Sequence, residues 1–342
     1  MKILVVGPSW IGDTVLAQPL FKLLHERNPG LVLDVLAPAW TAPIVRRMPE
    51  VRQVLASPFD HGEFNFSERR KLGRALRDER YDRAIVLPNT LKSAFVPFFA
   101  RIKRRTGYAR EMRWTVLNDI RVLDTAALPQ MAQRYAALGL ETGESLPHTL
   151  PAPQLITSHE TRRRTLSTLG LEGMRNPVAL CPGAEYGPAK RWPPNYFAEL
   201  ARELARNGDA VWLIGSAKDA SIGEDIVRLS GGACVNLCGK TTLDQAIDLM
   251  STVRLVVTND SGLMHVAAAV GTPLIAIYGS STPDHTPPMS DRASIVKLDI
   301  ECSPCFERTC PLGHFNCMML LKPDRVYAIA SATSPVNERR GT

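Results

Sequence analysis

A lone carboxylate, Asp13, stands where a catalytic base could act. It follows residues 7–12, which interrupt an apolar run at 2–6 and lead into a helical pattern. An acid in the first turn of a helix is favoured by the helix dipole alone. The same carboxylate could take a proton from a bound hydroxyl group if it is ionised and within hydrogen-bond reach. The residues by themselves leave both roles open.

A glycine-containing loop with a cation marks the second half of the chain. Residues 182–193 read Pro-Gly-Ala-Glu-Tyr-Gly-Pro-Ala-Lys-Arg-Trp-Pro and lie between an apolar run and a helical pattern. Such a loop suits a phosphate group, and Lys190 would offer a diphosphate a compact positive charge. The alternative is a surface loop with two solvated cations.

A third pattern, residues 258–269, reads Thr-Asn-Asp-Ser-Gly-Leu-Met-His followed by Val and three Ala. A strand that ends in Asn-Asp-Ser-Gly and passes at once into a helix would direct the backbone N–H groups of residues 261–263 at an anion. The alternative is simple helix capping by Asp260 or Ser261. His265 by itself is more typical of a hydrogen-bonded histidine near a core.

Strand and helix patterns alternate along both halves, which predicts an α/β fold with doubly wound parallel sheets. The expected strands are apolar runs separated by helical patterns: 2–6, 31–37, 83–87, 178–181, 211–214, 255–258 and 274–278. The alternation restarts after residues 143–153, which hold three prolines, and residues 170–177 form a further break. Ligands bind at the carboxyl ends of the strands in such sheets, which is where all three patterns above begin.

The composition indicates a globular protein of two domains. The chain has 342 residues, of which 45% are hydrophobic and 22% charged, and about 150 residues is a rough guide to one domain. No export signal and no stretch of about 18 uncharged apolar residues is present, which predicts a cytoplasmic protein. Residues 1–145 carry 22 Lys and Arg against 15 Asp and Glu, whereas 146–342 carry 19 of each. The basic half, with clusters at 69–71 and 101–105, predicts attraction to an acidic partner.

Two function classes are disfavoured by the absence of their motifs. No G-x-G-x-x-G follows either first strand, which argues against an NAD-dependent dehydrogenase. A nucleic-acid-binding module would show a known motif or an aromatic–basic stripe, and neither is found, so no nucleic-acid partner is expected.

Four of the seven cysteines fall within sixteen residues. They are Cys302, Cys305, Cys310 and Cys317, with His314 among them. These thiols could hold a structural zinc ion tetrahedrally, although the spacing is not that of a standard zinc ribbon. Reduced, partly buried thiols or a labile disulfide are the alternatives.

Residues 7–13, 182–192 and 258–269 together resemble the glycosyltransferase family 9 heptosyltransferases, in order and over nearly the whole chain. The resemblance implies a GT-B fold, in which two Rossmann-like doubly wound domains face each other. An acceptor-binding domain would span 1–172 and an ADP-heptose-binding domain 173–322. A last helix within 323–342 would pack back on the first domain.

The resemblance also implies a reaction. It is the inverting transfer of L-glycero-D-manno-heptose from ADP-heptose to the first heptose of heptosyl-Kdo2-lipid A. Because that acceptor is anionic and lies in a membrane leaflet, the enzyme is expected at the cytoplasmic face of the inner membrane as a peripheral protein. No cofactor and no catalytic metal are expected, since a lysine can supply the charge and no Asp-x-Asp motif occurs. A heptosyltransferase with another core acceptor and a nucleotide-sugar epimerase remain as alternatives.

Site roles follow from the resemblance, residue by residue. Asp13 matches the general base, and Lys190 matches the lysine that binds the donor phosphate and offsets the charge of departing ADP. Asp219 falls where some relatives carry a glutamate for the ribose hydroxyls. The other implied donor-binding residues are Gly239, Lys240, Thr241, Asp260, Ser261, Gly262, Leu263 and His265. The implied acceptor-binding residues are Trp10, Arg69, Arg70, Lys71, Asn89 and Lys92, with Arg104 and Arg105 as further cations for the anionic acceptor.

Overall fold

The computed structural model describes residues 1–59 and 62–333, and these divide into two compact units. The first unit holds Met1–Ile156 together with Asp284–Thr286, and the second holds Thr157–Pro283 and the chain from Pro287 onward. The sequence predicts a boundary at 172/173, whereas the units divide between Ile156 and Thr157. The helix at His159–Thr168 belongs to the second unit, because Thr161 and Thr165 on this helix donate hydrogen bonds to Asp248.

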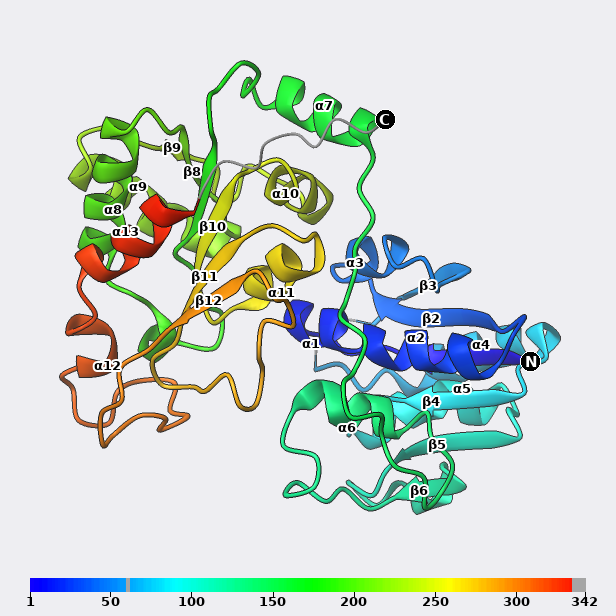
Figure 1. The fold of residues 1–342 in the computed structure, drawn as a ribbon. Coiled ribbons are helices and arrows are strands. Elements are labelled where there is room, and N and C mark those ends of the chain that lie inside the picture. The colour runs from blue at the N-terminus through cyan, green and yellow to red at the C-terminus, as the bar shows by residue number, and fades with distance from the viewer. Residues whose placement is uncertain (60–61, 334–342) are drawn as a thin grey trace. The chain divides into compact units, whose positions relative to one another are not determined.

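The first unit contains a six-stranded sheet and its covering helices (Figure 1). The elements in chain order are β1 (Lys2–Val6), α1 (Ile11–Leu16), α2 (Gln18–Arg27), β2 (Val32–Pro38), α3 (Ala42–Arg46), β3 (Gln53–Ser57), α4 (Phe66–Ala75), η1 (Leu76–Glu79), β4 (Arg83–Val86), η2 (Leu91–Ala94), α5 (Phe95–Phe99), β5 (Arg104–Tyr108), η3 (Arg113–Thr115), β6 (Asp119–Arg121) and α6 (Met131–Ala137).

All strands of this sheet are parallel, in the order β3-β2-β1-β4-β5-β6. Leu4 and Val6 of β1 join a buried cluster with Leu76 and Val96, on the face covered by α4 and α5. The neighbouring residues Ile3 and Val5 point to the other face and are fully buried as well. A strand buried on both faces is apolar without interruption, which is why the run at 2–6 was recognisable in the sequence.

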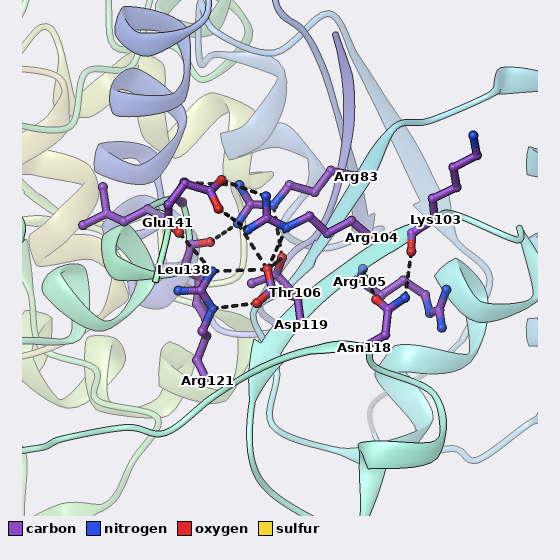
Figure 2. Close-up of polar contacts among 12 residues, drawn as sticks. Arg83, Lys103, Arg104, Arg105, Thr106, Asn118, Asp119, Arg121, Leu138 and Glu141 are labelled. Carbon is purple, nitrogen blue, oxygen red and sulfur yellow. Dashed lines mark hydrogen bonds and ion pairs between the residues drawn. The ribbon is translucent and has the colours of Figure 1, made fainter. Parts of the chain in front are cut away.

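The edge of this sheet is held by a network of charges (Figure 2). Asp119 of β6 accepts hydrogen bonds from Arg104, Thr106 and Arg121, and Arg104 also forms an ion pair with Glu141. These hydrogen bonds hold the pKa of Asp119 well below its usual range even though burial raises it. The sequence had assigned Arg104 to an external anion, but its partners lie within the unit.

The neighbouring Arg105 is likewise engaged within the unit. It donates hydrogen bonds to the backbone oxygens of Val116 and Ile102. Arg104 and Arg105 therefore stabilise the edge of the sheet.

The second unit repeats the plan with strands in the order β12-β11-β10-β7-β8-β9, again all parallel. Its elements are α7 (His159–Thr168), β7 (Val178–Cys181), η4 (Pro188–Lys190), α8 (Pro194–Arg206), β8 (Val211–Leu213), η5 (Ala217–Asp219), α9 (Ala220–Leu229), β9 (Val235–Asn236), α10 (Leu243–Met250), β10 (Leu255–Asn259), α11 (Gly262–Ala269), β11 (Leu274–Ile277), β12 (Ala293–Val296), α12 (Asn316–Met319) and α13 (Pro323–Ala332).

The last helix, α13, is part of the second unit. Val326 and Ala330 of α13 are fully buried in the hydrophobic core of this unit, and α13 packs along α8 (Figure 1). The packing of this helix on the first domain stays a prediction. The tail at 334–342 lies outside the described residues.

Among the described residues, no helix combines the length and the apolar character needed to cross a membrane.

Candidate functional site

A cavity of about 460 Å³ opens in the first unit beside the carboxyl ends of β1 and β4. Asp13 lines it from the first turn of α1, directly after the loop that leaves β1. The loop at residues 87–90, which leaves β4, lines it as well. Adjacent parallel strands end at the same edge of a sheet, so residue 13 and residues 87–90 meet in one cavity although they are far apart in the sequence.

Four of the predicted acceptor-binding residues line this cavity with Asp13. They are Trp10, Arg69, Asn89 and Lys92. Arg70 and Lys71 do not line it and are exposed on α4. A helix directs successive side chains about 100° apart, so a cluster that is contiguous in sequence divides between two faces.

Arg69 is fixed by its surroundings. It is 7% exposed, donates to the backbone oxygens of Phe64 and Glu63, and lies 4.0 Å from the ring centroid of Phe59. Burial lowers the pKa of this arginine. Most of its hydrogen bonds stabilise the loop before α4, so its contribution to the cavity is a positioned positive charge.

The sequence missed two residues that organise this cavity. Arg113 is buried and donates to the Asn89 side chain at 3.1 Å and to the Pro88 backbone oxygen at 2.6 Å, which fixes the loop after β4. Tyr135 of α6 also lines the cavity, and burial, followed by the charge of Asp13, raises its pKa. It therefore stays a neutral phenol beside the carboxylate. Neither residue belongs to a recognisable motif. Both lie far along the chain from the first strand, so the sequence does not link them to Asp13.

In the second unit the predicted donor-binding residues gather at the carboxyl edge of the sheet. The segments that follow β7, β8, β9 and β10 carry them, and these strands are neighbours in the sheet. Lys190 comes from η4 and forms an ion pair with Asp260, with Nζ 2.5 Å from Oδ2. Ser281, after β11, donates a hydrogen bond to the same carboxylate oxygen.

The turn after β10 holds the loop of residues 182–193 in place. Asn259 is fully buried; its side-chain oxygen accepts from the Trp192 N–H at 3.0 Å, and its amide donates to the Pro182 oxygen at 2.8 Å. Both ends of the loop are thus tied to one side chain. The position of the loop is therefore fixed relative to the start of α11.

The start of α11 is partly accessible at Ser261, Gly262 and Leu263, whereas the rest of the helix is buried through Ala269. The first N–H groups of a helix lack partners within it, which makes this end suitable for an anion. The alternative, capping by the Ser261 side chain, is not what the structure has, because the helix shows no side-chain cap hydrogen bond.

Asp219 performs a local structural role. Its carboxylate accepts from both the N–H and the hydroxyl of Ser216, which closes the turn after β8. A Cβ atom at Gly183 would lie 2.5 Å from this carboxylate, so the loops after β7 and β8 touch at these two residues. A role in ribose binding stays a prediction for Asp219.

The loop after β9 completes this edge. Gly239 has a φ of 73°, in the left-handed region, and donates its N–H to the Gly215 oxygen. Lys240 is exposed and Thr241 half-buried beside it. Lys240 and Thr241, two of the implied donor-binding residues, are therefore accessible.

Comparison with known proteins identifies the family. The profile of "Glycosyltransferase family 9 (heptosyltransferase)" matches residues 69–316. The chain belongs to glycosyltransferase family 9. It is 47% identical to the lipopolysaccharide heptosyltransferase 2 of Escherichia coli (strain K12), over 95% of this chain and 96% of that protein. It is 46% identical to the lipooligosaccharide heptosyltransferase 2 of Haemophilus influenzae, over 87% and 89%.

The solved structure of E. coli ADP-heptose lps heptosyltransferase II matches with a TM-score of 0.88 and 45% identity, over 97% of this chain and 98% of that chain. The similarity to a heptosyltransferase of the GT-B class confirms the predicted fold, with two doubly wound α/β units.

The cysteine cluster of this family 9 chain does not form a metal site. In the described part of the chain, no group of three or more His, Cys, Asp or Glu side chains is placed to hold a metal ion. All four cysteines are free thiols. Cys317 is buried in the core of the second unit, and the Cys310 sulfur accepts the Phe315 N–H at 3.4 Å. The structure therefore gives the predicted zinc ion no support.

The cysteine segment supports the loop of residues 182–193. Arg308 accepts the Ala189 N–H through its backbone oxygen, and Tyr186 donates from its hydroxyl to the Phe306 oxygen at 2.6 Å. The Lys190 ammonium lies 5.1 Å from the Tyr186 ring centroid. The position of the cation thus depends on a segment more than 100 residues away.

Replacing Gly187 with alanine tests this dependence. The new Cβ atom would lie 2.3 Å from the Arg308 backbone oxygen, so the loop and the cysteine segment must separate. We expect a loss of roughly 1–3 kcal/mol in the free energy of unfolding and weaker ADP binding, measured by urea denaturation and calorimetry. Wild-type stability together with wild-type ADP affinity would show that the two segments do not support each other.

His265 is buried in α11, and its Nδ1 atom has no hydrogen-bond partner in the described structure. Burial, helped by the charge of Lys190, lowers its pKa to about 4 although Asp260 opposes this. The histidine is therefore neutral at neutral pH. Its contribution to donor binding stays a prediction.

The low pKa of His265 predicts a loss of stability in mild acid. The unfolded chain binds a proton at this histidine below about pH 6.5, whereas the folded chain does so only near pH 4. Stability should therefore fall by about 2 kcal/mol between about pH 7.5 and about pH 5, as measured by urea denaturation. His265→Gln should flatten this dependence, and His159→Gln, at an exposed position, should leave it unchanged. Equal pH dependence in all three proteins would refute the assignment.

Proposed function

We propose that this heptosyltransferase transfers L-glycero-D-manno-heptose from ADP-heptose to the first heptose of heptosyl-Kdo2-lipid A, with inversion at the anomeric carbon. The names of the relatives support the donor and the lipopolysaccharide acceptor. The proposal depends on the placement of two charged residues. Asp13 lines a cavity of the first unit, and Lys190 lies beside the start of α11 in the second unit.

In the proposed reaction, Asp13 accepts the proton of the attacking hydroxyl group. A bond forms between that oxygen and the anomeric carbon, while the bond from this carbon to the ADP oxygen breaks. A positioned carboxylate is a suitable base for such a step. The cavity is large enough for a sugar-sized group, and Arg69 and Lys92 provide positive charge for an anionic acceptor.

Departing ADP gains negative charge, which Lys190 would offset. Stabilising charge that develops in the transition state is commonly the largest single contribution to catalysis. The backbone N–H groups of Ser261 and Gly262 would hold the diphosphate, and Asp260 would orient the lysine through its ion pair. Asp260 would therefore act on the donor through Lys190.

We further propose that the enzyme associates peripherally with the cytoplasmic face of the inner membrane, because the acceptor is anchored there by its acyl chains. The enzyme would need no metal ion and no cofactor. Excess chelator should leave the rate of heptosyl transfer unchanged.

The test is acceptor-dependent release of ADP from ADP-heptose. We expect release with heptosyl-Kdo2-lipid A and little release without it. Release only with Kdo2-lipid A would assign a different acceptor. Release of ADP or free sugar without any acceptor would contradict the transfer mechanism and favour an epimerase-like reaction.

A further inference from the structure

Three phenylalanine side chains of the first unit are exposed and joined by ring contacts. Phe64, Phe66 and Phe98 are 55%, 44% and 38% exposed. The ring centroids of Phe64 and Phe66 lie 6.3 Å apart, and both Phe66 and Phe98 contact the Phe99 ring, at 5.4 and 5.3 Å. The three rings therefore belong to one surface, since a shared neighbour connects them.

The helices that carry this surface are packed closely. α4 lies along α5, and a Cβ atom at Gly73 would come within 2.6 Å of both the Val96 oxygen and the Phe99 Cβ. Arg77 donates from Nε to the Phe99 oxygen at 2.9 Å. The two helices thus present their outer side chains as one fixed face.

Exposed positive charges lie on α4 and on the chain just after α5. Arg70, Arg74, Arg101 and Lys103 are exposed, and none has an acidic partner within the described residues. Burial, and then the charges of Arg101, Arg74 and Arg70, lower the pKa of Arg77, so these cations lie near one another. Lys71 is 3.9 Å from Glu68, which is the one acid on α4.

We name this surface the aromatic–basic face: Phe64, Phe66 and Phe98 with Arg70, Lys71, Arg74, Arg101 and Lys103. Arg104 and Arg105 are not included in this face, because their guanidinium groups bind partners within the first unit.

The same elements also line the acceptor cavity. α4 contributes Arg69 to the cavity and Arg70 and Arg74 to the face. α5 contributes Val96 to the cavity and Phe98 to the face. A molecule whose glycan enters the cavity is therefore recognised by the inner sides of helices whose outer sides form the aromatic–basic face.

We propose that the aromatic–basic face docks the first unit onto an anionic lipid bilayer, with the phenylalanines in the interfacial layer and the cations on the headgroups. The proposal rests on the proposed function, which requires access to a lipid-linked acceptor. Clustered cations attract anionic headgroups, and aromatic side chains partition into the interface. Scattered apolar residues are normal on a surface, whereas a connected aromatic cluster on elements that also carry exposed cations is typical of such a site.

Vesicle flotation without any acceptor tests the docking directly. The full chain should bind vesicles with about 30% phosphatidylglycerol and bind pure phosphatidylcholine much less, and about 0.5 M salt should release it. Arg74→Gln with Arg101→Gln should lower the partition coefficient at least tenfold. Arg163→Gln with Arg164→Gln, the same charge change at exposed positions of α7, should lower it less than about twofold.

Two further variants separate the chemistry of the face from a folding defect. Arg74→Lys with Arg101→Lys should bind as the wild type does, because the charge is kept. Phe64→Ser with Phe98→Ser should reduce binding to anionic vesicles. Equal loss in the α7 control, or equal binding to neutral and anionic vesicles, would overturn the proposal.

Activity measured with two forms of the acceptor distinguishes this proposal from the proposed function. The Arg74/Arg101 glutamine variant should match the wild type on a deacylated, soluble heptosyl–Kdo acceptor and be at least tenfold slower on acceptor embedded in vesicles. If the wild type binds vesicles but transfers no heptose to either acceptor, the proposed function fails while the docking face stands. Equal loss of rate on both acceptors would overturn the docking role.

Discussion

Replacing Asp13 with asparagine is expected to lower kcat for heptosyl transfer roughly 10²–10⁴-fold. Asparagine keeps the size and polarity of the side chain in the first turn of α1, but it cannot accept the proton of the attacking hydroxyl. The affinity for ADP should change little, because the predicted donor-binding residues belong to the second unit. Steady-state ADP release and calorimetric titration with ADP measure the two quantities.

The matched control is Asp78→Asn, an exposed acid of the same unit that lies in η1. It should retain the wild-type kcat. If Asp13→Asn lost ADP affinity and rate together, or lost stability to the same extent as activity, the carboxylate would be a helix-terminal acid without a role as the base.

Replacing Lys190 with methionine should lower kcat roughly 10²–10³-fold, since the charge on departing ADP would lose its cation. The variant should also raise KM for ADP-heptose. Removing the lysine leaves the 5%-exposed Asp260 carboxylate without its ionic partner, so we expect a loss of roughly 2 kcal/mol in the free energy of unfolding. Transfer kinetics and urea denaturation check the two parts.

The double variant Lys190→Met with Asp260→Asn separates the two parts. Neutralising Asp260 removes the unpaired buried charge, so most of the lost stability should return. Activity should stay low because the donor phosphates still lack their cation. Recovery of transfer in the double variant would mean that Lys190 serves only to neutralise Asp260.

The alternating α/β organisation was predictable because local sequence is sufficient for it. Central parallel strands are buried on both faces, so runs such as 2–6, 178–181 and 255–258 stand out as uninterrupted apolar segments. The strands that were missed are edge strands or are polar. β5 begins with two arginines and β9 has only two residues, so neither shows an apolar run.

The motifs predicted to bind the donor were also visible in the sequence, because each directly follows a strand end. In the structure, residues 182–193 form the loop after β7, and residues 258–269 form the turn from β10 into α11 and the helix itself. Only the tertiary structure revealed that Lys190 and Ser281 both bind the carboxylate of Asp260. These three residues lie on three separate loops, which meet because β7, β10 and β11 are adjacent in the sheet.

The fold class, the family resemblance and the residues that can do chemistry are predictable from the sequence, since they depend on residue type and on spacing along the chain. The division of contiguous clusters between interior and surface depends on the folded chain. Arg69 lines a cavity, whereas the neighbouring Arg70 is exposed on the surface. Arg104 forms ion pairs with Asp119 and Glu141, and Cys317 is buried in the core of the second unit. The physical reason is that a side chain's partners come from segments distant in sequence, and burial then fixes which of its interactions can form.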